Sequence, residues 1–286
     1  MDIQLACALD AAWRTRKTHF PDQITFAYPI DTALISLTGP HCALHCAHCG
    51  GHYLRHMQPI DEANVGAAPS ALISGGCDPA GRVPVAEYLS RIREISNGRR
   101  LNWHVGLIDE AAMQAIAPYV DVVSFDVVGD EQTIYEVYGL DKTPNDYAQT
   151  YAMLRRYARV VPHITVGLRH GELGHERPAM DMIERIGLEA LVFIVFIPTP
   201  GTRYADFAPP EVEQVALLLA EARQRFSTVP IHLGCMRPRG RYRSELDPLA
   251  VRAGINVLVS PSRAVTEAAQ SLGLKAIRTR ECCVFD

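Results

Sequence analysis

The sequence predicts an α/β fold: a parallel sheet forming a (β/α)8 TIM-type barrel, complete or partly open. Short runs rich in Val, Ile and Leu alternate with helix-like segments along the 286 residues. These runs are almost continuously apolar, which is typical of parallel strands covered by helices on both faces. About eight such units in a chain of this length match a barrel. A doubly wound open sheet is the alternative.

The elements follow in a regular order. Strands are predicted at residues 33–38, 71–74, 101–107, 122–128, 160–166, 191–197, 231–233 and 256–259. Helices are predicted at residues 84–95, 144–157, 210–226 and 261–272, each with a proline near its start. Residues 1–30 are expected to add a helix and a loop outside the barrel. Residues 31–286 would form the barrel domain, with the C-terminal tail folding over its rim.

Composition limits the function classes. The chain is 48% hydrophobic and 21% charged, with a net charge of −4, so bulk electrostatics suggests no nucleic-acid partner. The longest apolar run, residues 190–197, is shorter than the roughly 20 residues that cross a bilayer. The N-terminus lacks the basic and apolar regions of a secretory signal. We therefore expect a cytoplasmic protein that binds neither nucleic acid nor membrane.

The most informative motif follows the first predicted strand. Residues 39–51 read Gly-Pro-His-Cys-Ala-Leu-His-Cys-Ala-His-Cys-Gly-Gly, so that Cys42, Cys46 and Cys49 form a C-x3-C-x2-C triplet. Three thiolates at this spacing can hold three irons of a 4Fe–4S cluster and leave the fourth iron open. The position after a strand is where a barrel places its active site. The alternatives are a zinc site completed by a nearby histidine and plain core cysteines.

This triplet resembles the radical S-adenosylmethionine (SAM) superfamily. The resemblance implies that Cys42, Cys46 and Cys49 bind the cluster and that the open iron takes the amino and carboxylate groups of SAM. Reductive cleavage of SAM would give a 5′-deoxyadenosyl radical that abstracts hydrogen from an unactivated C–H bond. The residue before the last cysteine is usually aromatic in this family. Here it is His48, whose imidazole could still stack near an adenine.

Further segments resemble the SAM-binding elements of that superfamily. Gly75 and Gly76 follow the second strand and resemble its Gly-Gly-Glu element, although Cys77 replaces the acid. Ser124 and Asp126 end the fourth strand, where Asp126 could accept hydrogen bonds from ribose hydroxyls or simply face solvent. Arg169 follows the fifth strand and could pair with the SAM carboxylate or be a surface charge. The segment 196–202 resembles the sixth-strand turn beside the adenine.

Four other cysteines suggest a second iron–sulfur cluster. Cys77 and Cys235 follow predicted strands, and the expected fold of the tail would bring Cys282 or Cys283 near them. The alternative is that these are unrelated core cysteines, which is also the interpretation of Cys7. Sulfur-inserting members of the superfamily, biotin synthase and lipoyl synthase, use an auxiliary cluster as a sulfur source.

The combined pattern is similar to biotin-synthase-like proteins, and most similar to the paired lipoyl synthase type. This implies sulfur insertion at unactivated carbons of a protein-bound octanoyl group. The partners would be an octanoylated lipoyl-carrier protein, a second related radical SAM protein, and a reductase or ferredoxin that donates electrons. A basic segment could dock the acidic carrier or be a solvated loop; it comprises Arg237, Arg239, Arg241 and Arg243. Two alternatives remain: radical chemistry on a free small molecule, and a non-enzymatic iron–sulfur or zinc scaffold.

Overall fold

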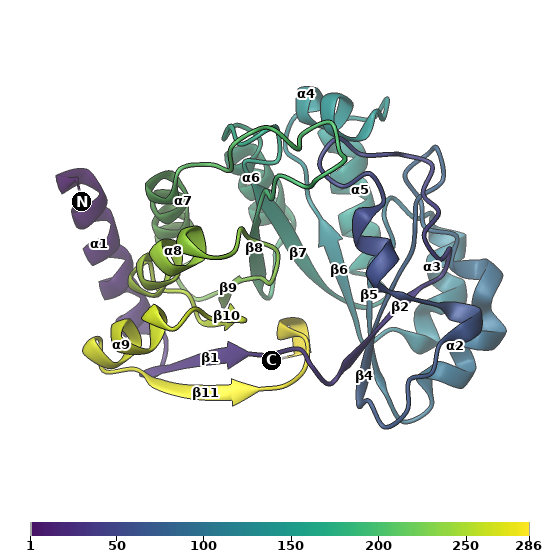
Figure 1. Cartoon of the computed structure of the whole chain (residues 1–286), viewed down its shortest axis with the longest axis horizontal. Helices are drawn as coiled ribbons and strands as arrows, with labels where there is room; N and C mark the ends of the chain where they lie inside the picture. Colours follow the sequence, from purple (N-terminus) through teal and green to yellow (C-terminus); the bar gives the residue numbers. More distant parts are fainter. Residues whose placement is uncertain (1, 286) are drawn as a thin grey trace.

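The computed structural model describes residues 2–285 as a curled, all-parallel sheet with helices on its outer face (Figure 1). This confirms the predicted α/β fold in its partly open form. The strands are β1 (Gln23–Ala27), β2 (Thr32–Ser36), β3 (Gln58–Pro59), β4 (Ser70–Ser74), β5 (Arg100–Trp103), β6 (Val122–Asp126), β7 (Arg159–Val166), β8 (Leu191–Val195), β9 (Ile231–Leu233), β10 (Val257–Val259) and β11 (Lys275–Thr279).

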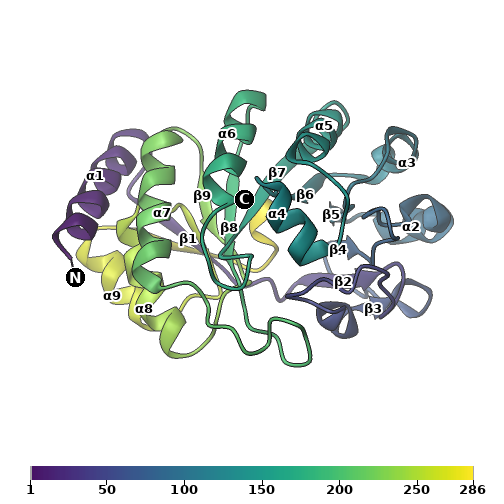
Figure 2. The ribbon, with the colours of Figure 1, turned by 90° about the horizontal axis from the view of Figure 1, so that it is seen from above.

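The helices form an arc around the outside of the sheet (Figure 2). They are α1 (Ile3–His19), α2 (Leu89–Ser96), α3 (Glu110–Ile116), α4 (Glu131–Thr133), α5 (Pro144–Leu154), α6 (Glu176–Ile186), α7 (Val212–Arg225), α8 (Arg241–Arg252) and α9 (Ala264–Ser271). Short helical turns are η1 (His52–His56), η2 (Ile60–Glu62), η3 (Val85–Tyr88), η4 (Ala117–Tyr119), η5 (Ile134–Tyr138) and η6 (Cys283–Phe285). No helix in the described residues is long and apolar enough to span a membrane.

Strand order explains why the barrel stays open. The order is β11-β1-β10-β9-β8-β7-β6-β5-β4-β2-β3, so the two edge strands, β11 and β3, are not hydrogen-bonded to each other. Consecutive strands β1 and β2 are likewise not paired. The eight predicted strands match β2 and β4 to β10. The expected loop before residue 30 is partly wrong, because residues 23–27 pair with β10 and β11. The strand β11 was not predicted, because its side chains are largely exposed and show no apolar run.

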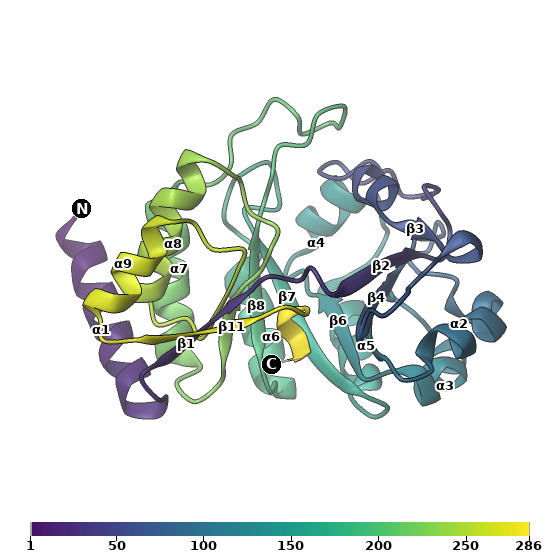
Figure 3. The same cartoon turned by 60° about the horizontal axis from the view of Figure 1, so that its bottom comes forward.

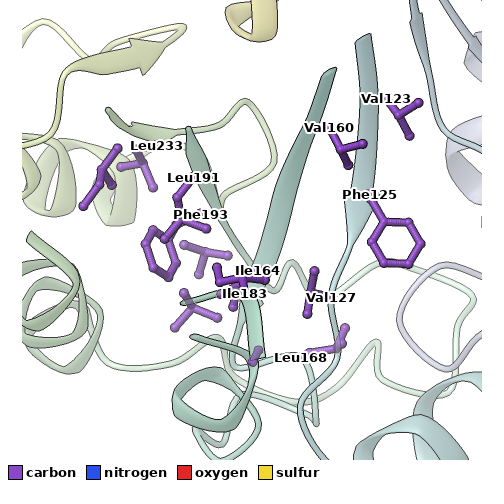
Figure 4. Close-up of a cluster of buried hydrophobic side chains, with 14 of the residues drawn as sticks. Val123, Phe125, Val127, Val160, Ile164, Leu168, Ile183, Leu191, Phe193 and Leu233 are labelled. Carbon is purple, nitrogen blue, oxygen red and sulfur yellow. The ribbon is translucent and has the colours of Figure 1, made fainter. Parts of the chain in front are cut away.

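The side chains of the strands alternate between two environments. One set packs against the helices in the main core, including Val123 and Phe125 of β6 and Phe193 of β8 (Figure 4). The other set faces the interior of the half-barrel, where Val122, Val161 and Val192 form a separate apolar cluster with residues of the tail. This alternation fixes which polar residues point inward.

The C-terminal tail lies at the opposite end of the sheet from the expected rim. Arg100, the first residue of β5, pairs with Glu281, and its guanidinium lies 4.5 Å from the ring centroid of Phe285. Arg159, the first residue of β7, donates to the carbonyl of Val284. Because first residues of parallel strands mark the amino-terminal edge, the tail closes that edge, within the curve of the sheet (Figure 3).

Candidate active site

The loop that carries the cysteine triplet is anchored to three neighbouring segments. It begins after β2, and the amide of Ala43 donates to the carbonyl of Cys77, 2.9 Å away. The amide of Ala47 donates to Val137 in η5 at 2.7 Å, and Ala47 accepts from the amide of Tyr204 at 3.0 Å. These bonds hold the loop above the carboxyl ends of β2, β4 and β6, which is the predicted location.

The thiols of this loop lie close enough to influence one another. Cys42, Cys46 and Cys49 are all partly buried. Burial, followed by the charges of Cys49, Cys42 and Cys77, raises the pKa of the Cys46 thiol. Burial and then the charge of Cys42 raise the pKa of Cys77 to about 12. Burial also raises the pKa of the Cys49 thiol. A group of adjacent thiols with raised pKa values suits a cationic iron centre, because bound iron would compensate the thiolate charges.

Cys77 lies beside the triplet. The turn after β4 packs directly on the triplet loop, which places Cys77 beside Cys42. Within residues 2–285, no group of three or more His, Cys, Asp or Glu side chains is arranged to hold a single metal ion. A cavity of about 620 Å³ opens beside the loop and is lined by Cys42, Gly76 and Cys77, among others.

Gly76 is where the two segments meet. A β-carbon at this position would lie 1.8 Å from the carbonyl oxygen of His41 and 2.6 Å from the Cα of Cys42. The amide of Gly76 donates to the Thr38 hydroxyl at 2.7 Å. Gly75 has more room, since its nearest contact would be 3.1 Å to Val83. The Gly-Gly pair thus seats the triplet loop on β4.

Gly76→Ala is expected to displace the triplet loop, because the added methyl overlaps backbone atoms that cannot move as a side chain can. We expect the unfolding free energy to fall by about 1–3 kcal/mol and iron uptake to fall by more than half. Thermal unfolding and iron analysis of the reconstituted protein measure both. Gly174→Ala is the matched control, because nothing lies within 4 Å of its β-carbon position. Equal iron contents in the two variants would contradict this role.

His48 lies within the triplet motif, between Cys46 and Cys49, and contacts a tyrosine. Its ring packs edge-on against Tyr138, with centroids 5.8 Å apart. Desolvation lowers the pKa of His48 to about 4, and its Nδ1 has no hydrogen-bond partner among the described residues. Tyr138 ends η5, a single π-helical turn of a kind often found at functional sites. The sequence does not predict a role for Tyr138, since nothing in residues 134–138 distinguishes a π-turn from an ordinary helix.

The two polar residues of β6 occupy different environments. The Ser124 hydroxyl donates to the side-chain oxygen of Asn102 at 2.8 Å and is 2% exposed, so its only donor hydrogen is used inside the barrel. Asp126 opens onto the interior, where desolvation raises its carboxyl pKa and nearby His163 opposes this. Of the predicted pair, Asp126 is the one available to a ligand.

Arg169 is paired with acids in this structure. Its guanidinium lies 3.3 Å from Glu172 and 3.9 Å from Glu136. The preceding turn is fixed by Glu176, a buried carboxylate that accepts from the amides of Gly167 (2.7 Å) and Gly174 (2.6 Å). A SAM carboxylate would have to compete with the two glutamates for Arg169.

A second contact joins the triplet loop to the turn after β8. The hydroxyls of Tyr53 and Thr199 lie 3.0 Å apart. Thr199 belongs to the segment 196–202, and a β-carbon at Gly50 would lie 3.4 Å from Thr202 in the same segment. The two segments expected to flank a bound cofactor are therefore neighbours.

Cys235 lies in the loop after β9, close enough to Cys282 for their charges to interact. Desolvation, followed by the charge of Cys282, raises the pKa of the Cys235 thiol. Cys282 enters from the closed end, where Asn102 Nδ2 lies 3.6 Å from its sulfur and Thr32 Oγ1 accepts from its amide at 2.9 Å. Cys283 packs in the inward apolar cluster. Cys7, expected in the core, is exposed on α1.

The predicted basic segment is not a single surface patch. Arg237 is fully buried and forms an ion pair with Asp247, with Nε 2.9 Å from Oδ1. Arg243 donates to the carbonyls of Cys235 and Arg237. Arg241 pairs with Glu245 at the surface. Half of the segment thus stabilises the loop around Cys235, and the idea that it forms one docking patch is wrong.

No protein-family model matches the chain, and a search of curated proteins found no match. Solved structures do match. Methylornithine synthase (PylB) superposes with a TM-score of 0.68 at 14% identity, covering 97% of this chain and 91% of that one. The chain has the fold of that enzyme.

Two other structures are similar. The FeFe-hydrogenase maturase HydG from Carboxydothermus hydrogenoformans gives a TM-score of 0.67 at 13% identity, covering 96% of this chain and 72% of that one. Streptococcus suis SuiB bound to S-adenosylmethionine gives 0.52 at 13% identity, covering 81% and 58%. SuiB also matches in a structure with its precursor peptide SuiA bound. At these identities the likeness establishes a shared fold.

Proposed function

We propose that this protein is a radical SAM iron–sulfur enzyme. The observation that carries the proposal is the C-x3-C-x2-C loop above the carboxyl ends of β2, β4 and β6, in a fold shared with a SAM-bound protein. When bound, the cluster and SAM supply the one-electron chemistry that activates a C–H bond. Cys42, Cys46 and Cys49 would hold the cluster.

We assign SAM recognition to residues around the same loop. Gly75 and Gly76 allow close backbone approach, and Asp126 offers a carboxylate toward ribose hydroxyls. His48 would lie near the adenine, and Arg169 would meet the SAM carboxylate after leaving Glu172. Ser124, assigned with Asp126, would act by orienting Asn102, since its hydroxyl donates there.

For the reaction, we propose sulfur insertion at unactivated carbons of a protein-bound octanoyl group, as in the paired lipoyl synthases. Support comes from the proximity of two thiols, Cys235 and Cys282, which with Cys283 would hold an auxiliary cluster. Cys77, which the sequence also predicts as a ligand of that cluster, lies beside the triplet. The partners would be an octanoylated carrier protein, a second related radical SAM protein and a ferredoxin or reductase. SuiB, which binds a precursor peptide, offers a precedent for a polypeptide substrate.

The reaction is tested with anaerobically reconstituted protein, dithionite, SAM and an octanoyl-lysyl peptide, with and without a second related radical SAM protein. Mass spectrometry should show addition of sulfur to the peptide. Cys235→Ala should abolish sulfur addition and remove part of the iron, whereas SAM cleavage should persist, because the triplet is intact. Unchanged iron and product in this variant would reject the auxiliary cluster.

A second function is favoured by one observation. The inward face of β6, β7 and β9 carries Asp126, His163 and His232, which is more polar than an octanoyl chain requires. We therefore also propose radical chemistry on a free, small polar molecule. Failure of the octanoyl assay with intact SAM cleavage would favour this second function.

A further inference from the structure

Four side chains that are aligned across neighbouring strands form a row along the interior face of the sheet, from β6 to β9. Asp126 is aligned with His163, His163 with Val192, and Val192 with His232. Phe125, Ile164 and Phe193, which adjoin residues of this row in sequence, belong to the core that packs against the helices (Figure 4). Because strand side chains alternate, the row itself faces the interior.

The histidines of this row are neutral and incompletely paired. His163 Nδ1 lies 3.0 Å from the carbonyl oxygen of Val161. A carbonyl only accepts, so Nδ1 carries the hydrogen and Nε2 is left as an acceptor. Desolvation lowers the pKa of His163 to about 4. His232 is 2% exposed, and its Nδ1 has no partner among the described residues.

The carboxylate of the row also lacks a partner. Within residues 2–285, no hydrogen bond or ion pair reaches the Asp126 carboxylate, and the one titratable neighbour that opposes the rise of its pKa is His163. The tyrosines Tyr138 and Tyr147 lie close enough for its charge to act on them. The partly desolvated Asp126 carboxylate and the acceptor nitrogen His163 Nε2 would both be stabilised by a ligand that carries positive charge and hydrogen-bond donors.

We propose that Asp126, His163 and His232 form a subsite for the protonated primary amine of a small substrate. The ammonium group has three donors, enough to reach the Asp126 carboxylate and His163 Nε2 together. This inference rests on the second proposed function and names the head group of its substrate. It competes with the assignment of Asp126 to the SAM ribose, whose hydroxyls are also donors.

The test compares three head groups on one alkyl chain. The reconstituted full-length protein, saturated with SAM, is titrated calorimetrically with hexylammonium, hexanol and hexanoate. Hexylammonium should bind at least about tenfold more tightly than the other two, because a charge-assisted hydrogen bond is lost without it. Asp126→Asn should remove this preference, and His163→Phe should weaken hexylammonium binding severalfold. Glu267→Gln, an exposed carboxylate of α9, controls for net charge.

The hexylammonium titration is repeated without SAM. Several results would overturn the subsite: equal binding of hexanoate, unchanged affinity in Asp126→Asn, or hexylammonium binding that is present without SAM and lost with it. The last result would mean that Asp126 serves SAM. The head-group comparison on the unaltered protein does not depend on the folding of any variant. SAM cleavage measured in the same preparation separates the two claims. Loss of cleavage with retained amine preference would refute the enzyme function and leave the subsite standing.

Discussion

Cys46→Ala is expected to lose about four irons per chain and to reduce SAM cleavage under dithionite to background. The Cys46 thiol lies close enough to Cys49, Cys42 and Cys77 for their charges to act on it. Two remaining thiols of the motif cannot hold three irons. Iron and sulfide analysis, the visible absorption of the cluster and the release of 5′-deoxyadenosine measure the effect.

Cys7→Ala is the matched control for this loss. It removes a thiol of the same chemistry from the exposed face of α1, far from the loop. We expect iron content and SAM cleavage to match those of the unaltered protein. If Cys46→Ala retains full iron and cleavage, the triplet is not the cluster site, and the zinc and scaffold alternatives return.

Asp247→Ala is expected to lower the free energy of unfolding by about 3–5 kcal/mol, because it leaves the buried Arg237 charge uncompensated. For a chain of this size, that is a fall in melting temperature of roughly 6–20 °C. Arg237 also donates to the carbonyls of Gly234 (2.7 Å) and Val259 (2.8 Å), and Asp247 accepts from the amide of Ser262 (2.7 Å). The variant should therefore loosen the loop that carries Cys235.

Glu245→Ala breaks a neighbouring ion pair at the surface, since Arg241 is 91% exposed and Glu245 47% exposed. Water replaces such a pair at little cost, so we expect the melting temperature to stay essentially unchanged. A similar melting temperature for both variants in a thermal scan would show that the Arg237–Asp247 pair contributes no more than a solvated one.

The sequence predicted the strands that are apolar on both faces and the chemistry of the loop after β2. It could not predict β1 as part of the sheet, because Gln23–Ala27 reads as a short stretch after a helix and its partners lie more than 200 residues away. The tail was misplaced for a related reason. Its position depends on Arg100 and Arg159, at the starts of distant strands, and not on local pattern.

The inward orientation of His232 could be predicted from the alternation of side chains along a strand. His232 stands between Ile231 and Leu233, so its opposite orientation follows from the strand period. Whether it faces a neighbouring polar residue depends on the register between β8 and β9, which no single strand encodes. The approach of Cys235 to Cys282 likewise required the tail to enter from the closed end.

The sheet order has a consequence for how the chain acquires its structure during synthesis. From β4 to β10 each new strand pairs with the one made just before it, so this part can assemble as it is translated. The N-terminal strand is different, because Thr25 aligns with Val257 and Ile277. The strand β1 is synthesised first but cannot pair until β10 and β11 have been made. We therefore expect α1 and β1 to be the last part of the chain to gain protection from hydrogen exchange.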